Sequence, residues 1–368
     1  MEKPIVIAYY LPQFHPTVNN DKWWGKGFTE WTNVAKAQKL YKGHYQPHIP
    51  ADLGFYDLRL PKVREQQAEM AKYAGVSAFC YYHYWFENGN EELDLPFKEV
   101  VASGKPDFPF CLCWANESWY SKMWNKEGAV VSKKLLAEQK YLGEEDNIKH
   151  FNSLLPAFKD KRYLKYKGKI VFVIYRPLLF KGIIEFIQQW RNLAKDAGLN
   201  DFYFIGYTYD VASEYNKIIE LGFDAVDDCG IVNYQMYNNG LINKIKSKLN
   251  NYKRKLFNLP AIHQYKDVSQ FFLSEEYDLL EEVLPTLIPN WDHTPRSGSN
   301  GYLFENSTPE EFSKHVQRLK EIISQKENKI CFLKSWNEWG EGNYVEPDLK
   351  YGWGYLDVLH NEISGSNE

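Results

Sequence analysis

The chain has 368 residues and a formal net charge of −4, and aromatic residues make up 17% of it. A surface that is acidic on balance does not attract polyanions, which excludes nucleic acid as the expected partner. The length allows two ordinary domains or one large α/β barrel with insertions. Because no segment looks like a linker, an internal repeat or a low-complexity region, we expect one domain over residues 1–363 and a disordered tail over 364–368.

The cysteine pattern and the N-terminus indicate the compartment. The cysteines are odd in number, lack zinc-ligand spacing and lie in or beside apolar runs; they are Cys80, Cys111, Cys113, Cys229 and Cys331. We interpret them as reduced, buried thiols. No charged region precedes a long apolar stretch at the N-terminus, and no run approaches the roughly 18 apolar residues of a membrane span. We therefore expect a cytoplasmic protein without a transmembrane segment.

Short apolar segments alternate with helical patterns along the whole chain. The expected strands are 4–11, 76–85, 108–115, 169–175, 202–209, 223–229, 286–291 and 329–335. The expected helices are 60–74, 93–102, 146–158, 183–197, 214–221, 276–284 and 309–324. Strands that are apolar throughout are buried on both faces, which implies a parallel sheet covered by helices. Without a Gly-rich phosphate-binding turn after the first strand, the pattern favours a closed (β/α)8 TIM barrel over an open doubly wound sheet.

Two insertions account for the additional length. The first, residues 12–59, separates the first strand from its helix, and we interpret this long loop as a wall or lid of a cleft. The second follows strand six and is basic; it contains Lys244, Lys246, Lys248, Lys253, Arg254 and Lys255. The 241–256 stretch is either a solvated basic helix or a peripheral contact for an anionic glycan or a membrane surface.

Polar and aromatic residues follow the end of every predicted strand. In a barrel these ends share one face, where barrel enzymes hold their active sites. We therefore expect several tryptophans near one cleft, namely Trp24, Trp31, Trp85, Trp119, Trp291 and Trp336. The competing interpretation is that polar residues begin wherever strands stop and that many aromatic residues form an ordinary core.

The most informative stretch is 335–342 (SWNEWGEG), directly after the last predicted strand. Glu338 and Glu341 lie between tryptophans and glycines, which are unusual on an exposed helix face. Paired carboxyls can divide acid and base roles at a glycosidic carbon, and aromatic faces stack on the apolar side of a sugar ring. This stretch therefore predicts a carbohydrate site; a solvated helix face is the alternative.

Several runs, taken in order, resemble one family. They are 8–15 (AYYLPQFH), 27–33 (GFTEWTN), 291–296 (WDHTPR) and 336–342 (WNEWGEG). Together they resemble the WbsX-type family, whose members are often found in bacterial polysaccharide loci and are related to glycoside hydrolase family 99. The resemblance covers about residues 4–348.

The resemblance implies a fold, an activity and two functional carboxylates. Family-99 enzymes are retaining endo-acting α-mannosidases with a barrel fold, whereas WbsX-type members are commonly labelled glycosyltransferases or lipopolysaccharide-biosynthesis proteins. In the family scheme, Glu338 deprotonates the 2-hydroxyl of the sugar, which attacks its own anomeric carbon to give a 1,2-anhydro intermediate. Glu341 protonates the leaving oxygen and then acts as a base toward water. The scheme requires a raised pKa for Glu341 and an ionised Glu338.

A wider set of residues is expected to bind the substrate. These are His15, Trp24, Glu30, Trp31, His83, Tyr84, Trp85, Asn116, Glu117, Tyr209, Trp291, Asp292, Arg296, Trp336, Asn337 and Trp339. The acidic members have a second interpretation, as helix caps or as partners of Arg176 and Arg296. The histidines are spread over several strand ends, so we expect no metal site and no cofactor.

The leading hypothesis is a retaining glycoside hydrolase or transglycosidase that acts on a bacterial oligosaccharide or polysaccharide. The second is a glycosyltransferase in lipopolysaccharide, O-antigen or capsule biosynthesis. Asp227 and Asp228 resemble the acidic pairs of metal-dependent glycosyltransferases, but no nucleotide-phosphate cradle accompanies them. The third is a glycan-binding barrel that has lost its catalytic activity. The presence of both glutamates argues against this third hypothesis.

Overall fold

The computed structural model describes residues 3–124, 130–234, 252, 254 and 256–365. Its main sheet is a closed ring of parallel strands in the order β1-β14-β12-β10-β9-β8-β4-β2, closed by the pairing of β2 with β1. The strands are β1 (Ile5–Tyr10), β2 (Ala78–Glu87), β4 (Phe110–Trp114), β8 (Lys169–Ile174), β9 (Phe202–Thr208), β10 (Ala225–Asp228), β12 (Val283–Leu287) and β14 (Ile330–Leu333). The predicted (β/α)8 TIM barrel is confirmed.

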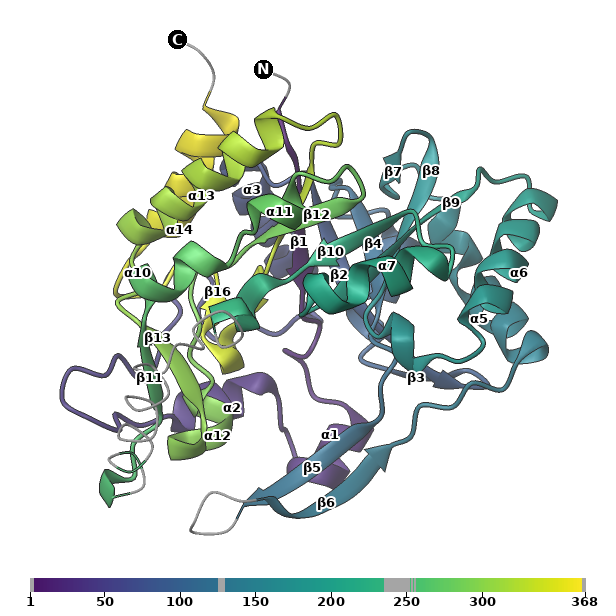
Figure 1. The fold of residues 1–368 in the computed structure, drawn as a ribbon. Coiled ribbons are helices and arrows are strands. Elements are labelled where there is room, and N and C mark those ends of the chain that lie inside the picture. The colour runs from purple at the N-terminus through teal and green to yellow at the C-terminus, as the bar shows by residue number, and fades with distance from the viewer. Residues whose placement is uncertain (1–2, 125–129, 235–251, 253, 255, 366–368) are drawn as a thin grey trace.

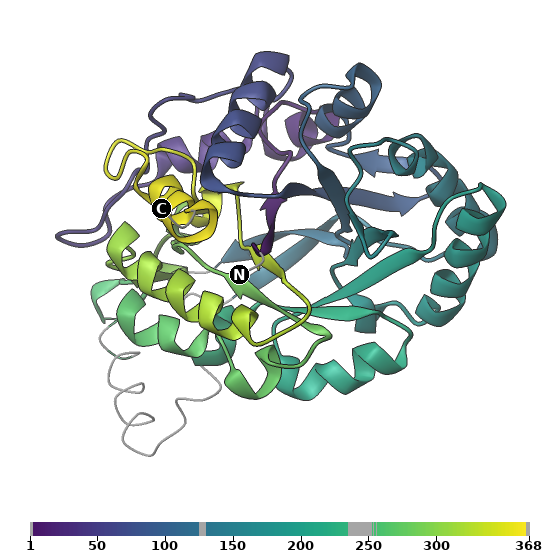
Figure 2. The ribbon, with the colours of Figure 1, turned by 90° about the horizontal axis from the view of Figure 1, so that it is seen from above.

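Helices surround this ring on the outside, as the view along the barrel shows (Figure 2). The longer ones are α3 (Pro61–Ala74), α4 (Leu95–Ser103), α5 (Glu144–Phe158), α6 (Ile183–Asp196), α7 (Val211–Glu220) and α13 (Pro309–Ser324). Each connects two neighbouring parallel strands of the ring. The helices cover the outer face of the strands, and the inner face points into the closed barrel. Both faces are therefore buried, which explains why β8 and β9 are apolar almost throughout.

Close packing of helix on strand is visible at Gly206 in β9. A Cβ atom at this position would lie 2.5 Å from a side-chain carbon of Ile218 in α7, so a larger residue would push the helix outward. Helix ends follow ordinary capping rules. In α13, Thr308 accepts a hydrogen bond from the backbone N–H of Glu311, and Pro309 occupies the first helical turn.

One pair of predicted elements is wrong. Residues 276–284 were expected as a helix and 286–291 as the seventh strand, but the helix α11 (Glu275–Asp278) is short and β12 already begins at Val283. Val283 and Leu284 are fully buried between β10 and β14. Burial on both faces of the sheet therefore overrides the helix-like spacing of the apolar residues.

Several of the remaining elements lie at the carboxyl-terminal end of the barrel (Figure 1). The long loop after β1 contains α1 (Val18–Trp24) and α2 (Glu30–Lys36), and an antiparallel hairpin of β5 (Trp119–Trp124) and β6 (Val130–Ala137) follows β4. Smaller elements are β3 (Asn90–Glu92), β7 (Lys165–Tyr166), β11 (Ala261–Gln264), α10 (Tyr265–Val268), α12 (Thr294–Ser297), β13 (Tyr302–Glu305), β15 (Asn337–Glu338), β16 (Asn343–Tyr344) and α14 (Gly354–Leu359).

Some predictions concern residues that the structure leaves out or only partly covers. The basic stretch 241–256 lies almost wholly outside the described residues. The predicted tail, 364–368, begins at Ser364, which closes a short π-helical turn (His360–Ser364), and residues 366–368 are not described. Among the described residues, no helix is long and apolar enough to cross a membrane. The single domain over 1–363 stays a prediction.

Candidate active site

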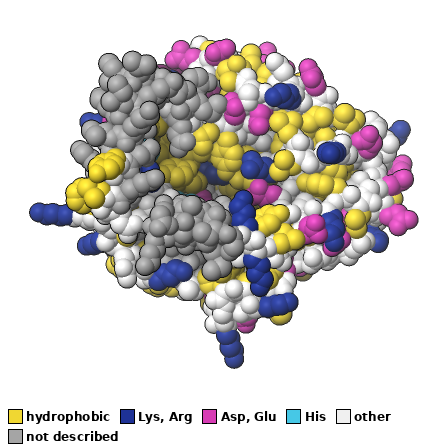
Figure 3. Space-filling view, turned by 60° about the horizontal axis from the view of Figure 1, so that its bottom comes forward, with side chains coloured by type: hydrophobic (Ala, Val, Ile, Leu, Met, Phe, Trp, Pro, Cys, Tyr) yellow, Lys and Arg dark blue, Asp and Glu magenta, His cyan; other side chains and the backbone are white. Residues whose placement is uncertain are grey.

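A large cavity opens at the carboxyl-terminal end of the barrel, with a volume of about 1240 Å³. On this side of the molecule, hydrophobic, acidic and basic side chains lie next to one another (Figure 3). Several predicted site residues line the cavity: Trp24, Glu30, Tyr84, Asn116, Glu117, Tyr209, Arg296, Glu338 and Glu341. The long loop after β1, the ends of the barrel strands and the β5–β6 hairpin all contribute to its wall.

Glu338 and Glu341 enter the cavity from a tight hairpin. β15 and β16 pair antiparallel, and the 3-10 turn Trp339–Glu341 connects them. Steric constraints explain why the motif has glycine at positions 340 and 342. A Cβ at Gly340 would lie 2.0 Å from a carboxylate oxygen of Glu30, and Gly342 has a φ of 53° and packs against the backbone of Asp292. The motif therefore brings Glu30 against the turn that carries the two glutamates.

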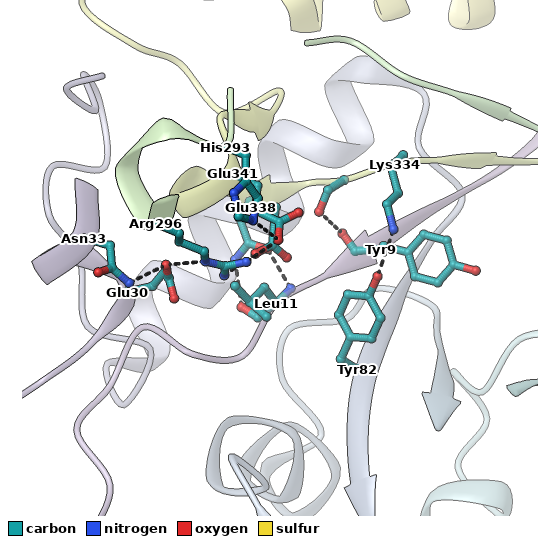
Figure 4. A network of polar contacts seen from close by, with 12 residues as sticks. Tyr9, Leu11, Glu30, Asn33, Tyr82, His293, Arg296, Lys334, Glu338 and Glu341 are labelled. Atoms are coloured by element: carbon teal, nitrogen blue, oxygen red, sulfur yellow. Dashed lines mark hydrogen bonds and ion pairs between the residues drawn. The ribbon is translucent and has the colours of Figure 1, made fainter. Parts of the chain in front are cut away.

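Arg296 joins the three carboxylates, as Figure 4 shows. Its Nε donates to Glu30 Oε1 at 2.8 Å, its Nη2 donates to Glu338 Oε1 at 2.6 Å, and its Nη1 donates to Glu341 Oε1. We call Glu30, Arg296, Glu338 and Glu341 the carboxylate cluster. With three glutamates on one guanidinium, the cluster has too little positive charge for all three to ionise at low cost.

The two glutamates of the motif have different pKa shifts. Burial raises the pKa of Glu338 to about 7, against the opposing influence of Arg296. Burial also acts on Glu341, but Arg296, His293 and Lys334 together hold the pKa of its carboxyl below the usual value. In this arrangement the proton therefore belongs on Glu338, which is the reverse of the order that the family scheme requires.

The tryptophans of the motif do not face the cavity. Trp336 and Trp339 are fully buried, and their indole N–H groups donate to the two carboxylate oxygens of Glu346 at 2.9 and 2.7 Å. Glu346 also accepts hydrogen bonds from Gln67 and Tyr56, at 2.6 and 2.9 Å. The sequence analysis overlooked this glutamate. The expected stacking of these two tryptophans on sugar is replaced by a structural role, which anchors the hairpin that carries Glu338 and Glu341.

Asn337 and Asp292 are also anchors behind the cavity wall. Asn337 exchanges two hydrogen bonds with the backbone of Leu11, at 2.7 and 3.1 Å, and so ties the motif to β1. Asp292 accepts from His44 at 2.9 Å and from Gln46 at 2.7 Å, and it holds part of the long β1–α3 loop. Neither side chain lines the cavity.

Five further predicted residues are buried away from the cavity: His15, Trp31, His83, Trp85 and Trp291. His83 contacts His150 at 2.8 Å between ring nitrogens, and Trp85 stacks on the same His150 ring. Of the six tryptophans expected around one cleft, only Trp24 and Trp119 line it, so that expectation is wrong for the other four. The aromatic side chains of these residues, although placed near strand ends, pack in the hydrophobic core and do not line the cavity.

Aromatic and polar residues form another part of the cavity wall. Tyr84 packs edge-on against Trp119 at 4.8 Å between ring centroids. Asn116 fixes Arg176 through its backbone, and Glu117 forms an ion pair with the Arg176 side chain at 3.2 Å. Wall residues of this kind offer apolar ring faces beside hydrogen-bonding groups, as a sugar ligand requires.

Other cavity residues were not predicted as ligand contacts, although the sequence contains a signal for one of them, Tyr82. They are Tyr82, Tyr175, Arg176, Tyr302 and Lys334. Tyr82 precedes the predicted Tyr84 by two positions on β2, and side chains two apart point to the same face of a strand. Applying this alternation at the strand ends would have found Tyr82, whereas Lys334 was hidden in the run before the glutamate motif.

Asp227 and Asp228 do not form the metal-binding pair of a glycosyltransferase. Both are fully buried in β10, and Asp227 accepts hydrogen bonds from Tyr9 and Thr286. Burial raises the pKa of Asp227 to about 6. Within the described residues, no group of three or more His, Cys, Asp or Glu side chains has an arrangement that could hold a metal ion.

The fold and the site define a class: a (β/α)8 barrel protein with a large cavity at the strand ends, walled by aromatic residues and holding clustered carboxylates. The comparison with protein families agrees with the resemblance seen in the sequence. Residues 6–359 match the model of the family described as Glycosyltransferase WbsX, and the chain belongs to this family.

Two relatives from Xanthomonas campestris pv. campestris carry the name "Uncharacterized protein WxcX". Each is 32% identical over 364 residues, which is 98% of this chain and 49% of the relative. The chain thus spans about half the length of the curated relatives it matches.

Among solved structures, a protein described as "Glycoside hydrolase-like protein" matches with a TM-score of 0.59 and 16% identity, over 99% of this chain and 94% of the other. The GH99 endo-alpha-mannosidase from Bacteroides thetaiotaomicron, in complex with BIS-TRIS-Propane, matches with a TM-score of 0.54 and 16% identity, over 98% and 96% of the two chains. At this identity the likeness concerns the fold.

Proposed function

We propose that this protein is a glycan-acting enzyme that cleaves or transfers a glycosidic bond with Glu338 and Glu341. The observation that carries the proposal is the carboxylate pair itself. Both glutamates face one large cavity, share Arg296 and differ in the direction of their pKa shifts. Two carboxyls whose environments separate their pKa values can act as acid and base at the same reacting centre.

The size and lining of the cavity favour an oligosaccharide or polysaccharide. Its volume of about 1240 Å³ exceeds the range of roughly 300–1,000 Å³ that is typical of sites for small molecules. Trp24, Trp119 and Tyr84 supply apolar ring faces on its wall. A glycan is proposed because the family is described as a glycosyltransferase and a neighbour in fold is an endo-alpha-mannosidase, and a bacterial one because the curated relatives come from Xanthomonas campestris.

The proposed mechanism follows the retaining scheme of the related hydrolases. Glu338 removes the proton of the sugar 2-hydroxyl, whose oxygen attacks the anomeric carbon while Glu341 protonates the departing oxygen. Water, activated by Glu341, then opens the 1,2-anhydro sugar, and its addition regenerates the starting protonation of both carboxyls. Transfer to a sugar hydroxyl in place of water gives a transglycosidase by the same steps.

The order of the two pKa values adds a requirement to this scheme. With the pair arranged as described, a single proton belongs on Glu338. The scheme needs it on Glu341 when the sugar is bound. Loss of the bond between Arg296 and Glu341 on substrate binding would raise the pKa of Glu341 in the required direction, because that bond is among the interactions that lower it.

A glycosyltransferase is the second candidate, and the description of the family favours it. Such an enzyme would use a nucleotide sugar as donor in the assembly of lipopolysaccharide, O-antigen or capsule. We place either activity in the cytoplasm. All five cysteines are free and buried, which is the state expected of a protein from a reducing compartment.

The experiment is incubation with bacterial polysaccharides and their oligosaccharide fragments, with and without a panel of nucleotide sugars. The proposal predicts new reducing ends, or transfer products, without any nucleotide. The Glu338→Gln, Glu341→Gln double variant is the matched control. Product that forms only when a nucleotide sugar is present would refute the hydrolase proposal and establish the glycosyltransferase.

A further inference from the structure

Lys334 follows β14 and lines the cavity, apart from the carboxylate cluster (Figure 4). Its side chain is surrounded by tyrosines from the ends of several barrel strands. These are Tyr9, Tyr82, Tyr175, Tyr207 and Tyr209, which we call the tyrosine floor. The ammonium lies 4.8 Å from the ring centroid of Tyr207, with three other ring centroids between 5.5 and 5.9 Å. Aromatic faces of this kind stabilise a cation but do not neutralise it.

The ammonium of Lys334 has no carboxylate within ion-pair distance in the part of the chain that the structure describes. It donates one firm hydrogen bond, to the hydroxyl of Tyr207 at 2.9 Å, and a longer one to Tyr82 at 3.4 Å. The residue is only 5% exposed. A buried ammonium without a direct counter-ion is costly, so this arrangement favours a negatively charged ligand group.

A second cation lies on the same tyrosines. The hydroxyls of Tyr175 and Tyr209 contact each other at 2.6 Å. The guanidinium of Arg176 lies 5.5 and 5.8 Å from the centroids of these two rings, and Lys334 lies 5.9 and 5.8 Å from them. Arg176, Tyr175, Tyr209 and Lys334 all line the cavity. This hydroxyl pair has one proton left for a ligand, and two cations flank it: Lys334, and Arg176, which also pairs with Glu117 at 3.2 Å.

The protonation states are consistent with this description. Burial alone opposes a charged lysine, but the neighbouring Cys229, Tyr175, Glu341 and Glu338 raise the pKa of the Lys334 ammonium above its usual value. Burial also raises the pKa of Tyr175 and Tyr209, so both keep their protons; one proton makes the hydrogen bond between the two hydroxyls, and the other remains for a ligand. The floor of the cavity therefore offers donors and positive charge together.

We propose that Lys334, Arg176 and the members of the tyrosine floor that line the cavity, Tyr82, Tyr175 and Tyr209, form a subsite for an acidic sugar, whose anionic group binds at the Lys334 ammonium and the tyrosine hydroxyls. This inference rests on the proposed glycan-acting function and narrows its substrate class to glycans that contain a sugar with a carboxylate, or with another anionic group such as a phosphate. The alternative role of Lys334, as a distant counter-charge for Glu338 and Glu341, requires no such ligand.

The test measures binding and needs no turnover. Matched monosaccharides are titrated into the intact protein by ligand-observed NMR: glucose, glucuronate and glucose 6-phosphate, and galactose, galacturonate and galactose 6-phosphate. We expect at least one acidic sugar to bind roughly tenfold or more tightly than its neutral counterpart, as expected for a charge-assisted hydrogen bond. The uronate and phosphate arms identify which anionic group the subsite takes.

The variants assign that preference to Lys334. Lys334→Met should reduce the preference to about twofold or less while the neutral sugar still binds, and Lys334→Arg should keep most of it. If Lys334→Met does not fold, Arg176→Gln provides the same comparison from the other side of the tyrosine pair, with a smaller loss expected. Equal binding of acidic and neutral sugars by the wild type, or equal loss of both in the variants, would overturn the inference.

The outcomes separate this inference from the proposed function. Selective binding of an acidic sugar without cleavage of any glycan would keep the subsite and refute the enzyme. Equal cleavage of a native acidic glycan and its carboxyl-reduced form would keep the enzyme and refute the subsite.

Discussion

Glu338 and Glu346 belong to the same stretch of chain after β14, and burial raises the pKa of each to about 7. Their surroundings differ. Glu346 accepts hydrogen bonds from neutral donors on Trp336, Trp339, Gln67 and Tyr56, whereas Glu338 shares one arginine with two other glutamates and faces the cavity. A buried carboxyl that is fully paired holds the structure, and one that competes for a shared cation remains available for chemistry.

Removing the shared cation should have the largest effect. Arg296→Met leaves three glutamates without their common partner, so we expect the free energy of unfolding to fall by roughly 3 kcal/mol. We also expect the variant to lose activity. Chemical denaturation at neutral pH measures the change in the free energy of unfolding. Arg176→Met is the matched control, because its single ion pair is more exposed and should contribute less than about 1 kcal/mol. Equal destabilisation by the two variants would contradict the central position of Arg296.

The pH dependence of turnover should report the glutamates that face the cavity. With one proton shared by Glu338 and Glu341, activity on natural glycans requires the singly protonated pair. The pair loses that proton as the pH rises through about 7, the value to which burial raises the pKa of Glu338. We expect kcat/KM to fall about tenfold per pH unit above this value. Glu346→Gln should leave this fall in kcat/KM at the same pH. A shift of the fall in that variant would show that Glu346, and not the pair of Glu338 and Glu341, controls the pH dependence.

Gly340 tests the contact between the hairpin and Glu30. In Gly340→Ala the new methyl group meets the Glu30 carboxylate, and we expect a loss of about 1–3 kcal/mol from overpacking. Glu30→Ala in the same chain removes the obstacle, so the double variant should lose less than the sum of the single variants. Thermal unfolding of the three variants measures this, and strictly additive losses would show that the two residues do not touch.

The smallest expected effects concern two tryptophans, one that anchors the hairpin and one on the cavity wall. Trp339→Phe removes a hydrogen bond to Glu346 and should cost about 1–3 kcal/mol of stability. Trp24→Phe, on an exposed cavity wall, should change stability by less than about 0.5 kcal/mol but raise the KM for a glycan. A stability loss in Trp24→Phe as large as that in Trp339→Phe would remove the distinction between anchor and wall.

The sequence predicted the barrel because its signal is repeated. Apolar runs such as that of β8 recur between helical patterns, and parallel strands buried on both faces leave this signature even without other information. The seventh strand was misplaced because Val283 and Leu284 continue a helix-like spacing, and only the register with β10 and β14 decides otherwise.

The site was predictable in part. The spacing of Glu338 and Glu341 identified the carboxylates, but whether a tryptophan faces the cavity or the core depends on its partner, and Glu346 lies outside the motif. Lys334 could not be singled out either, because its environment is assembled from tyrosines on several distant strands.

The most direct test of the account separates the two glutamates by role. On a natural glycan, Glu341→Gln and Glu338→Gln should both lose activity, because each carboxyl is needed. On a substrate with an acidic leaving group, such as a glycosyl fluoride, Glu341→Gln should recover most of the general-acid contribution of roughly 10² to 10⁴-fold, while Glu338→Gln stays inactive. Equal loss in both variants on the activated substrate, or turnover of a 2-deoxy analogue, would contradict the proposed mechanism.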